Sequence, residues 1–372
     1  MRAASRPVAL RTLRVASRYA TRAILALLGV GTVAGAQAAD KLYVVNQAGA
    51  TISVIDQQRL AVDTVLDLRT LGFTANAKPH HVAVENDGSF WYVSLIGDGR
   101  VLKFDRNNRL VGQVALETPG LLSLDPVHDS LYVGRSMTAV NPPKALGVIA
   151  RRGFTLVDEH EIIIPRPHAL AVSLDGAWVH TASLAENRIA SIEVKTGRVR
   201  LTSIPGVARS LVQFALSPDG RWMVAGGELS NSLLVFDLTQ PPPFTPAREV
   251  PLAGKPWEVR FSPDGRTVYV TLLAKNGVAE LDASTWQVRR TMDQQFAQPY
   301  GMILRGDGRY AFVTNQNAAP VEEGHSGHAM HGMATPGAKD GWLTVLDLAT
   351  GAVHARLPLG AGPTGAGAAR AR

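Results

Sequence analysis

Short runs of apolar, β-branched and aromatic residues recur along the chain, with polar turns between them. An Asp-Gly pair marks the turn at five places, whose aspartates are Asp87, Asp175, Asp219, Asp264 and Asp307. The spacings are 88, 44, 45 and 43 residues, and the turn-rich residues 124–130 stand halfway through the double gap. Asp-Gly between apolar runs is a strong hairpin signal because both residues tolerate positive φ. The pattern therefore predicts a structural repeat of about 44 residues.

The same order of strands returns around each turn. A proline opens the first strand eight residues before the aspartate, as at Pro79, Pro167, Pro256 and Pro299. A β-branched and aromatic strand follows the turn, the third strand ends on an acid, and the fourth is more polar. Four short antiparallel strands in about 40 to 45 residues are typical of a propeller blade. Seven such sets begin near Lys41, Pro79, Pro119, Pro167, Leu211, Pro256 and Pro299, which predicts an all-β, seven-bladed β-propeller.

The first set lacks its opening strand, because Lys41 leads directly into an apolar run. Residues 362–367, at the other end of the chain, resemble a blade opening. A C-terminal strand that completes the N-terminal blade would close the ring and remove two exposed sheet edges, which are otherwise an aggregation hazard. We therefore predict ring closure by the C-terminal strand.

The first 38 residues have the pattern of a secretory signal peptide. They contain six arginines and no acid, followed by the apolar residues 23–30 and by Ala36-Gln37-Ala38. This is the order of the basic, apolar and small-residue regions of such a leader. An uncleaved anchor is the alternative, but the apolar run is shorter than the roughly 20 residues that span a membrane. We expect cleavage after Ala38, a periplasmic location, no membrane span in the mature protein and one propeller over residues 39–372.

Charge and cysteine content exclude several classes of function. Outside the leader the chain has 32 of its 38 basic residues and all 31 acidic residues, so the net charge of the mature chain is close to zero. A nucleic-acid partner is therefore not expected. The chain has no cysteine, which excludes disulfides, a thiol nucleophile and covalent haem attachment through C-x-x-C-H. We expect a soluble monomer whose partner is an unknown protein or a small molecule at a propeller face or in the channel.

The repeats resemble the YVTN-type β-propeller family. The similar segments are residues 42–46 with 51–56 and 311–315 with 344–347, together with the Ser-Pro-Asp-Gly-Arg segments 217–221 and 262–266. The resemblance covers essentially the whole chain after the leader. It implies the fold, but these repeats are structural, and the family includes surface, periplasmic and haem-associated propellers. Function therefore has to come from the site.

Five side chains near the start of the predicted opening strands are candidates for binding a ligand or cofactor. Opening strands line the central channel of a propeller, so the residues after the opening prolines are expected near its rim. These candidates are His80, His81, His168, Trp257 and Tyr300, with Gly120 and Thr364 as small equivalents. Histidine is a common metal ligand, and aromatic rings offer stacking surfaces. The alternative is that the histidines only bond to neighbouring backbone.

The family resemblance suggests one more specific cofactor. Propeller domains of haem-containing nitrite reductases and of their assembly proteins resemble this chain in repeat and compartment, and they hold their cofactor with rim histidines. His80 and His168 are the position-matched candidates in this sequence. A haem-associated oxidoreductase or assembly factor is thus one alternative function, and a lactonase-like hydrolase that uses Glu258 with a divalent cation is another.

The last predicted blade contains the most unusual segment of the chain. About 26 residues separate its second and third strands, an insertion at about 317–341, where other blades use about 5 to 8. Its candidate metal ligands are His325, His328, Met330, His331 and Met333. Thioether sulfur suits Cu(I) and imidazole suits copper and zinc, so copper is favoured, with zinc as the second choice. A variable surface loop with incidental histidines is the alternative.

Signals for catalysis are weak, and no catalytic residue is assigned. The sequence has no G-x-S-x-G elbow, P-loop, H-E-x-x-H or dinucleotide fingerprint. We therefore favour a binding or scaffold protein that handles a transition metal through the His/Met-rich insertion over an enzyme that acts in the channel.

Overall fold

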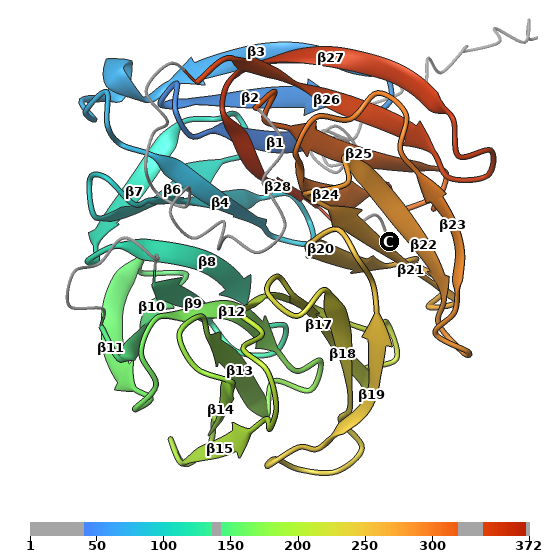
Figure 1. Ribbon diagram of the computed structural model, residues 1–372. Helices are drawn as coiled ribbons and strands as arrows, with labels where there is room; N and C mark the ends of the chain where they lie inside the picture. Colours follow the sequence, from blue (N-terminus) through green and yellow to red (C-terminus); the bar gives the residue numbers. More distant parts are fainter. Residues whose placement is uncertain (1–40, 136–142, 319–337, 370–372) are drawn as a thin grey trace, which may run out of the picture. The chain divides into compact units, whose positions relative to one another are not determined.

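A computed structural model describes residues 41–135, 143–318 and 338–369. These residues form seven four-stranded antiparallel sheets arranged as the blades of a ring (Figure 1). The predicted all-β, seven-bladed propeller is confirmed. One 3₁₀ turn, η1 (Leu68–Leu71), follows the first blade. Within the described residues there is no helix with the length and apolar character needed to cross a bilayer.

Blades 2, 3 and 4 follow one another between residues 79 and 203. Blade 2 contains β4 (Pro79–Val84), β5 (Phe90–Leu95), β6 (Arg100–Asp105) and β7 (Leu110–Ala115). Blade 3 contains β8 (Pro119–Leu124), β9 (Ser130–Arg135), β10 (Ala145–Ala150) and β11 (Thr155–Glu161). Blade 4 contains β12 (Pro167–Val172), β13 (Trp178–Ser183), β14 (Arg188–Glu193) and β15 (Val199–Ser203).

The next three blades repeat this order. Blade 5 contains β16 (Leu211–Leu216), β17 (Trp222–Gly227), β18 (Ser232–Asp237) and β19 (Pro246–Pro251). Blade 6 contains β20 (Pro256–Phe261), β21 (Thr267–Leu272), β22 (Gly277–Asp282) and β23 (Val288–Met292). Blade 7 contains β24 (Pro299–Leu304), β25 (Tyr310–Asn315), β26 (Asp340–Asp347) and β27 (Val353–Ala361).

Blade 1 is built from both ends of the described chain. Its strands, in sheet order, are β28 (Pro363–Ala368), β1 (Lys41–Asn46), β2 (Thr51–Asp56) and β3 (Ala61–Asp67). The innermost strand β28 lies between β24 and β4, so the ring of inner strands is complete. The predicted closure by the C-terminal strand is confirmed.

The Asp-Gly turns form between the first and second strands of their blades, as predicted, but the two residues have different roles. Only the glycine of each pair takes positive φ, between 66° and 74°. The aspartate instead accepts a backbone N–H two residues further on at 2.9–3.1 Å, as Asp219 does from Arg221. Asx turns of this kind satisfy a backbone donor that the hairpin leaves open. In each Asp-Gly pair, the glycine therefore meets the conformational requirement of the turn and the aspartate meets its hydrogen-bonding requirement.

The acids at the ends of the third strands have a similar local role. Their carboxylates accept backbone N–H groups of the following turn at 2.8–3.1 Å; they are Asp56, Asp105, Asp237, Asp282 and Asp347. This explains why an acid recurs there, since a side-chain acceptor satisfies the exposed turn amides.

The core lies between neighbouring blades, where the second and third strands contribute nearly continuous apolar faces. A ring stack joins blade 1 to blade 2: Tyr43 lies 4.3 Å from Trp91, and Trp91 lies 4.2 Å from Phe104, between ring centroids. Trp91 is completely buried and its indole N–H donates to the carbonyl of Asp105. Stacked aromatic pairs contribute more to folding stability than the surface area that they bury accounts for. The stack therefore stabilises the contact between blades 1 and 2.

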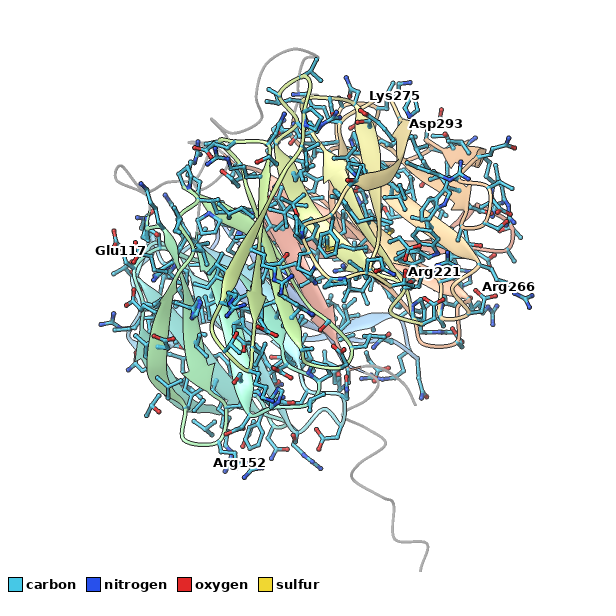
Figure 2. All side chains as sticks on the ribbon, turned by 90° about the horizontal axis from the view of Figure 1, so that it is seen from below. Glu117, Arg152, Arg221, Arg266, Lys275 and Asp293 are labelled. Atoms are coloured by element: carbon cyan, nitrogen blue, oxygen red, sulfur yellow. The ribbon has the colours of Figure 1, made fainter. Side chains whose placement is uncertain are left out.

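The two faces of the ring differ in the connections that they carry. On one, here called the entry face, the inner strands begin; on the other, the Asp-Gly face, lie the Asp-Gly turns and the turns between third and fourth strands. Figure 2 shows Glu117, Lys275 and Asp293 toward the entry face and Arg152, Arg221 and Arg266 toward the opposite one. Since neighbouring strands are antiparallel, each blade presents two connections to each face.

Candidate functional site

The first residues of the inner strands gather at the entry-face end of the channel. His80, His168, Trp257 and Tyr300 each follow the proline that begins β4, β12, β20 or β24. The pairing of each of these strands with its neighbour has a register shift just after that proline. A local irregularity of this kind redirects the side chains next to it.

His80 and His168 face each other although they belong to blades 2 and 4. Their ring centroids are 5.9 Å apart at an interplanar angle of 62°. The intervening inner strand β8 has Gly120 at the matching position, so blade 3 contributes no side chain there. His80 is 3 % and His168 is 2 % exposed. The two imidazoles therefore form a buried pair at the centre of the molecule.

The two histidines differ in their hydrogen bonds. His168 Nδ1 lies 2.8 Å from the carbonyl oxygen of Val212 on blade 5. A carbonyl can only accept, so in the neutral ring Nδ1 carries the proton and Nε2 carries the lone pair. Neither ring nitrogen of His80 has a hydrogen-bond partner among the described residues. Burial, followed by the nearby His81, lowers the pKa of His80 to about 3, so this imidazole is neutral near pH 7.

A charged cluster lies beside the histidine pair. Glu258 is 4 % exposed, accepts from Gln213 Nε2 at 3.0 Å and forms an ion pair with Arg260 Nη1 at 2.6 Å. Arg260 Nε also donates to the carbonyl of Met302 at 3.0 Å. Burial raises the pKa of Glu258, while Arg260 and Gln213 oppose that rise. Glu258 Oε2 is thus hydrogen-bonded, whereas Oε1 lies in ion-pair contact with Arg260 without forming a hydrogen bond.

His81 and the aromatic candidates complete the channel end. His81 Nδ1 accepts the backbone N–H of Leu122 at 3.2 Å. Trp257 is 1 % exposed, and its ring centroid lies 5.0 Å from that of Tyr300 on the next blade, where both pack with Val212. Burial, then Glu258 and Glu228, raises the pKa of Tyr300 well above its usual value. All five candidate residues thus reach one region, which is packed by protein side chains.

The arrangement brings imidazole, carboxylate and guanidinium groups together with two aromatic rings. Neutral imidazoles are metal ligands, and His168 has the backbone-bonded nitrogen that commonly orients such a ligand. In the three described stretches of chain, no group of three or more His, Cys, Asp or Glu residues is placed to hold a metal ion. His80 and His168 form a pair and not such a cluster.

The proposed metal ligands of the last blade, His325, His328, Met330, His331 and Met333, lie outside the described residues. The residues on either side of them are described. Asn315, at the end of β25, is in register with Pro299 on one side and Trp342 on the other. Asn317 Nδ2 donates to the carbonyl of Asp340 at 2.9 Å, so both flanks lie together on the entry face.

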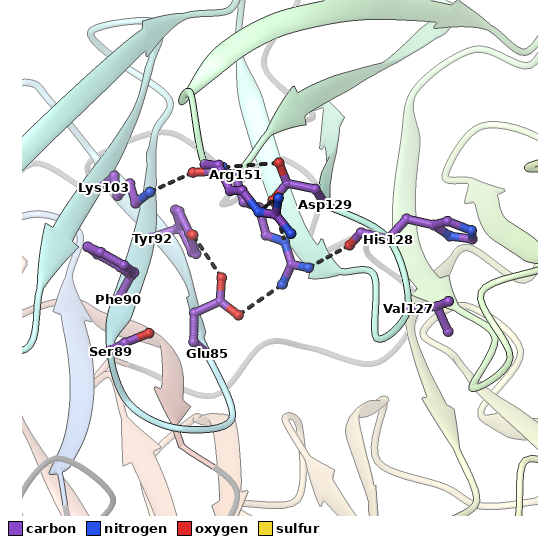
Figure 3. Close-up of a pocket in the computed structure, with 10 residues that line it drawn as sticks. Glu85, Ser89, Phe90, Tyr92, Lys103, Val127, His128, Asp129 and Arg151 are labelled. Carbon is purple, nitrogen blue, oxygen red and sulfur yellow. Dashed lines mark hydrogen bonds and ion pairs between the residues drawn. The ribbon is translucent and has the colours of Figure 1, made fainter. Parts of the chain in front are cut away.

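A cavity of about 450 Å³ lies on the Asp-Gly face between blades 2 and 3 (Figure 3). Glu85 accepts from Tyr92 Oη at 2.8 Å and from Arg151 Nη1 at 2.9 Å. Lys103 Nζ donates to the carbonyl of Arg151 at 2.5 Å and lies 4.2 Å from the centroid of Phe90. Burial lowers the pKa of Lys103. Because each charge is matched by a group of the neighbouring blade, this network joins the two blades.

A second cavity, of about 380 Å³, lies on the same face between blades 4 and 5. Its lining includes Trp178 and His180 on one side and Phe244 on the other. His180 is 1 % exposed, its Nδ1 lies 2.9 Å from Ser191 Oγ, and its ring centroid is 5.4 Å from that of Phe244. These contacts satisfy the imidazole within the protein.

Known structures share this architecture. No protein-family model matches the chain, and no curated protein matches it. Hydrazine synthase of Kuenenia stuttgartiensis is similar with a TM-score of 0.62 and 18% identity over 78% of this chain and 89% of that one. The likeness establishes the fold alone.

Two further structures have the same ring. The dihydro-heme d1 dehydrogenase NirN, in complex with DHE, matches with a TM-score of 0.60 and 17% identity over 89% of this chain and 75% of that one. A functionally unknown protein from Desulfotomaculum acetoxidans matches with a TM-score of 0.67 and 14% identity over 87% and 98% of the two chains. At such identities the residues of the site are not transferable.

Two residues of this site, Arg260 and Gln213, are not among the candidates that the sequence indicates. Arg260 could have been found, because it lies two residues after Glu258 and a strand places such residues on the same side. The alternative role for the histidines, bonding to neighbouring backbone, describes His81 and His168 but not His80. His80 is therefore the candidate whose two buried ring nitrogens both lack a hydrogen-bond partner among the described residues.

Proposed function

We propose that this protein is an exported, periplasmic propeller of the YVTN-repeat type that binds a transition metal ion on its entry face, copper in preference to zinc. One observation carries the proposal: both flanks of the His/Met-rich segment are held on the face where the channel histidines lie. Asn317 and Asp340 are hydrogen-bonded to each other there, and Asn315 is in register with Pro299, next to Tyr300. The ring thus holds the described residues on either side of the segment at one place.

The chemistry of the segment supports copper. Its three histidines and two methionines stand within nine positions, and the chain has no cysteine to compete for the ion. Thioether sulfur favours Cu(I), and imidazole accepts both copper oxidation states and zinc. The leader pattern of residues 1–38 supports export, and the Ser-Pro-Asp-Gly-Arg segments support membership of the YVTN-type repeats.

Copper titration of the mature protein tests the proposal. We would compare the intact chain with a variant in which residues 319–337 are replaced by a short Gly-Ser linker, which the adjacent flanks can accommodate. A matched control keeps the length but replaces the three histidines by asparagine and the two methionines by leucine. Both variants are expected to lose at least one equivalent of bound copper. Equal stoichiometry and affinity in all three proteins would show that the segment does not bind the ion.

A second candidate function is a cofactor-binding or haem-associated role at the channel. The observation that favours it is the buried, neutral His80, and the NirN structure was obtained in complex with DHE. The packing argues for a smaller ligand, because His80 lies 5.9 Å from His168, both are almost fully buried and so is Trp257. An absorption spectrum of protein purified from the periplasm distinguishes the two functions. A Soret band would support haem, and stoichiometric copper without it would support metal handling.

A further inference from the structure

The cavity between blades 2 and 3 on the Asp-Gly face is lined by a lysine whose donors the neighbouring groups only partly satisfy (Figure 3). Lys103 is 7% exposed, and its only side-chain hydrogen bond in the described chain runs from Nζ to the carbonyl of Arg151. The two carboxylates that line the cavity, Glu85 and Asp129, are instead in ion-pair contact with Arg151 and Arg152. An ammonium group has three N–H donors, so two remain for another acceptor.

Three aromatic rings surround this ammonium group. Lys103 Nζ lies 4.2 Å from the ring centroid of Phe90, 5.7 Å from that of Phe154 and 5.9 Å from that of Tyr92. The faces of aromatic rings attract a cation, which offsets part of the cost of burying the charge. Because the lysine already occupies this position, it repels a second cation, whereas an anion can accept its remaining N–H donors.

Two arginines at the same cavity add donors for an anion. Arg151 Nε is buried without a hydrogen-bond partner among the described residues and lies 4.0 Å from Asp129 Oδ1. The side chain of Arg152 is 90% exposed, and its Nε lies 3.9 Å from the same oxygen, which is too far for a hydrogen bond. Hydrogen bonds from lysine or arginine to a carboxylate are roughly twice as strong as those between neutral groups. These donors therefore suit a carboxylate.

Charge and shape limit the class of ligand. Three cationic and two anionic side chains line the cavity, so its net charge is +1 when His128 is neutral. The two carboxylates repel a dianion more strongly than a monoanion. Val127 is exposed and Phe90 is half-buried, and both offer apolar contacts beside the donors. A volume of about 450 Å³ lies within the usual range of small-molecule sites.

We propose that this cavity binds a small carboxylic acid in its anionic form. The carboxylate contacts Lys103 and Arg152, and the apolar part of the molecule lies against Phe90 and Val127. The site lies on the Asp-Gly face, whereas both flanks of the His/Met-rich segment lie on the entry face. It shares no residue with the proposed metal ligands or with the channel, so it is independent of the proposed copper function.

Isothermal titration of the mature protein with benzoate and with hexanoate tests the proposal. Each is expected to bind with one equivalent. Three comparison ligands are expected to bind at least tenfold more weakly: acetate lacks the apolar part, sulfate carries a second negative charge, and benzylammonium has the size of benzoate with the opposite charge. The proposal is overturned if neither benzoate nor hexanoate shows saturable binding, or if benzylammonium binds as tightly as benzoate.

Three variants locate the ligand. Lys103→Met keeps an apolar stem but removes the ammonium group, and it is expected to weaken benzoate binding about tenfold or more. Arg152→Gln changes an exposed side chain, so it should weaken binding about threefold to tenfold and leave the melting temperature unchanged. Arg266→Gln is the matched control, because Arg266 is an exposed arginine on the same face in blade 6. It should bind benzoate as the parent does.

The melting temperature of each variant shows whether it is folded. Unchanged benzoate affinity in folded Lys103→Met overturns the proposal, and so does unchanged affinity in Arg152→Gln. If the buried substitution prevents folding, Arg152→Gln decides the question by itself, since its side chain lies at the surface. Weaker binding in Arg152→Gln with parental affinity in Arg266→Gln supports the site between blades 2 and 3. Equal losses in these two variants indicate binding to the face as a whole and overturn it.

Discussion

Tyr43 and Gly367 lie opposite each other in the ladder between β1 and β28, although more than 300 residues separate them in sequence. Their pairing joins the first and last described strands within one blade. On its other side β28 meets β4, where a Cβ atom built on Gly367 would stand 2.7 Å from the carbonyl oxygen of Val82. Glycine at this position thus allows the closing strand to approach blade 2.

This geometry predicts the effect of two changes in the closing strand. Gly367→Ala should destabilise the protein by about 1–3 kcal/mol, because the backbone of β4 or β28 has to move. Deletion of residues 361–372 should lower the melting temperature by several degrees, because β1 and β4 lose their innermost neighbour. Gly153→Ala is the matched control, since its nearest neighbour would be Thr155 Oγ1 at 3.8 Å, and it should stay within about 0.5 kcal/mol. Unchanged melting after the deletion would show that β28 is dispensable.

The buried His180 predicts a pH dependence of stability. Burial lowers its folded-state pKa to about 4, against the opposing charge of Asp175, while the unfolded chain titrates near its ordinary value of about 6.5. Between these values the unfolded state binds one more proton than the folded state. Stability should therefore fall as the pH decreases from about 6.5 to 4, by about 1.4 kcal/mol per pH unit for this residue.

Urea unfolding at pH 7, 6 and 5 measures this slope. His180→Gln, which retains a donor for Ser191, should reduce it by about 1.4 kcal/mol per pH unit relative to the parent. Parallel slopes for the parent and His180→Gln would contradict the assignment.

The cavity between blades 2 and 3 predicts an energetic coupling between Glu85 and Arg151. Their side chains are only 19% and 18% exposed, and their ion pair crosses the blade boundary. A double-mutant cycle with Glu85→Gln and Arg151→Met should give a coupling energy of about 1 kcal/mol. The matched pair is Arg152 and Asp129, 3.9 Å apart with Arg152 90% exposed, for which a few tenths of a kcal/mol are expected. Equal couplings would mean that burial does not distinguish the two pairs.

The leader predicts a defined mature protein. Chain recovered from the periplasm should begin at Ala39, and mass spectrometry of the intact protein measures this directly. Replacing the arginines of residues 1–38 by asparagine should reduce export, because the basic region of a signal peptide directs insertion. Recovery of the full-length chain in the membrane fraction would instead support the uncleaved anchor.

The repeat architecture was predictable because the residues that begin, turn and end the strands of each blade act locally in the sequence. The opening Pro256, the turn at Asp264-Gly265 and the terminal Asp282 each act within a few residues of their own position. Local chemistry of this kind is visible in sequence. The reason given for the turns was only half correct, since the aspartate acts through its carboxylate while glycine alone supplies positive φ.

The site was predictable only in part, because its decisive contacts depend on the curvature of the ring. His80 and His168 are both predictable as channel residues, but their ring contact joins blades 2 and 4 across blade 3, which no local pattern indicates. Lys103, which contacts the carbonyl of Arg151, was not identified. Contacts between blades link residues about one repeat apart or more, and no local pattern encodes them.

The closing strand also sets the order in which the molecule can be completed. β28 is synthesised after every other strand of the ring, and in the exported form proposed above it also crosses the membrane after them. Until then blade 1 has three strands, β1 and β4 lack their inner neighbour, and the circle stays open. A chain of this design can cross the membrane in extended form and becomes a closed ring only when residues 363–368 have arrived.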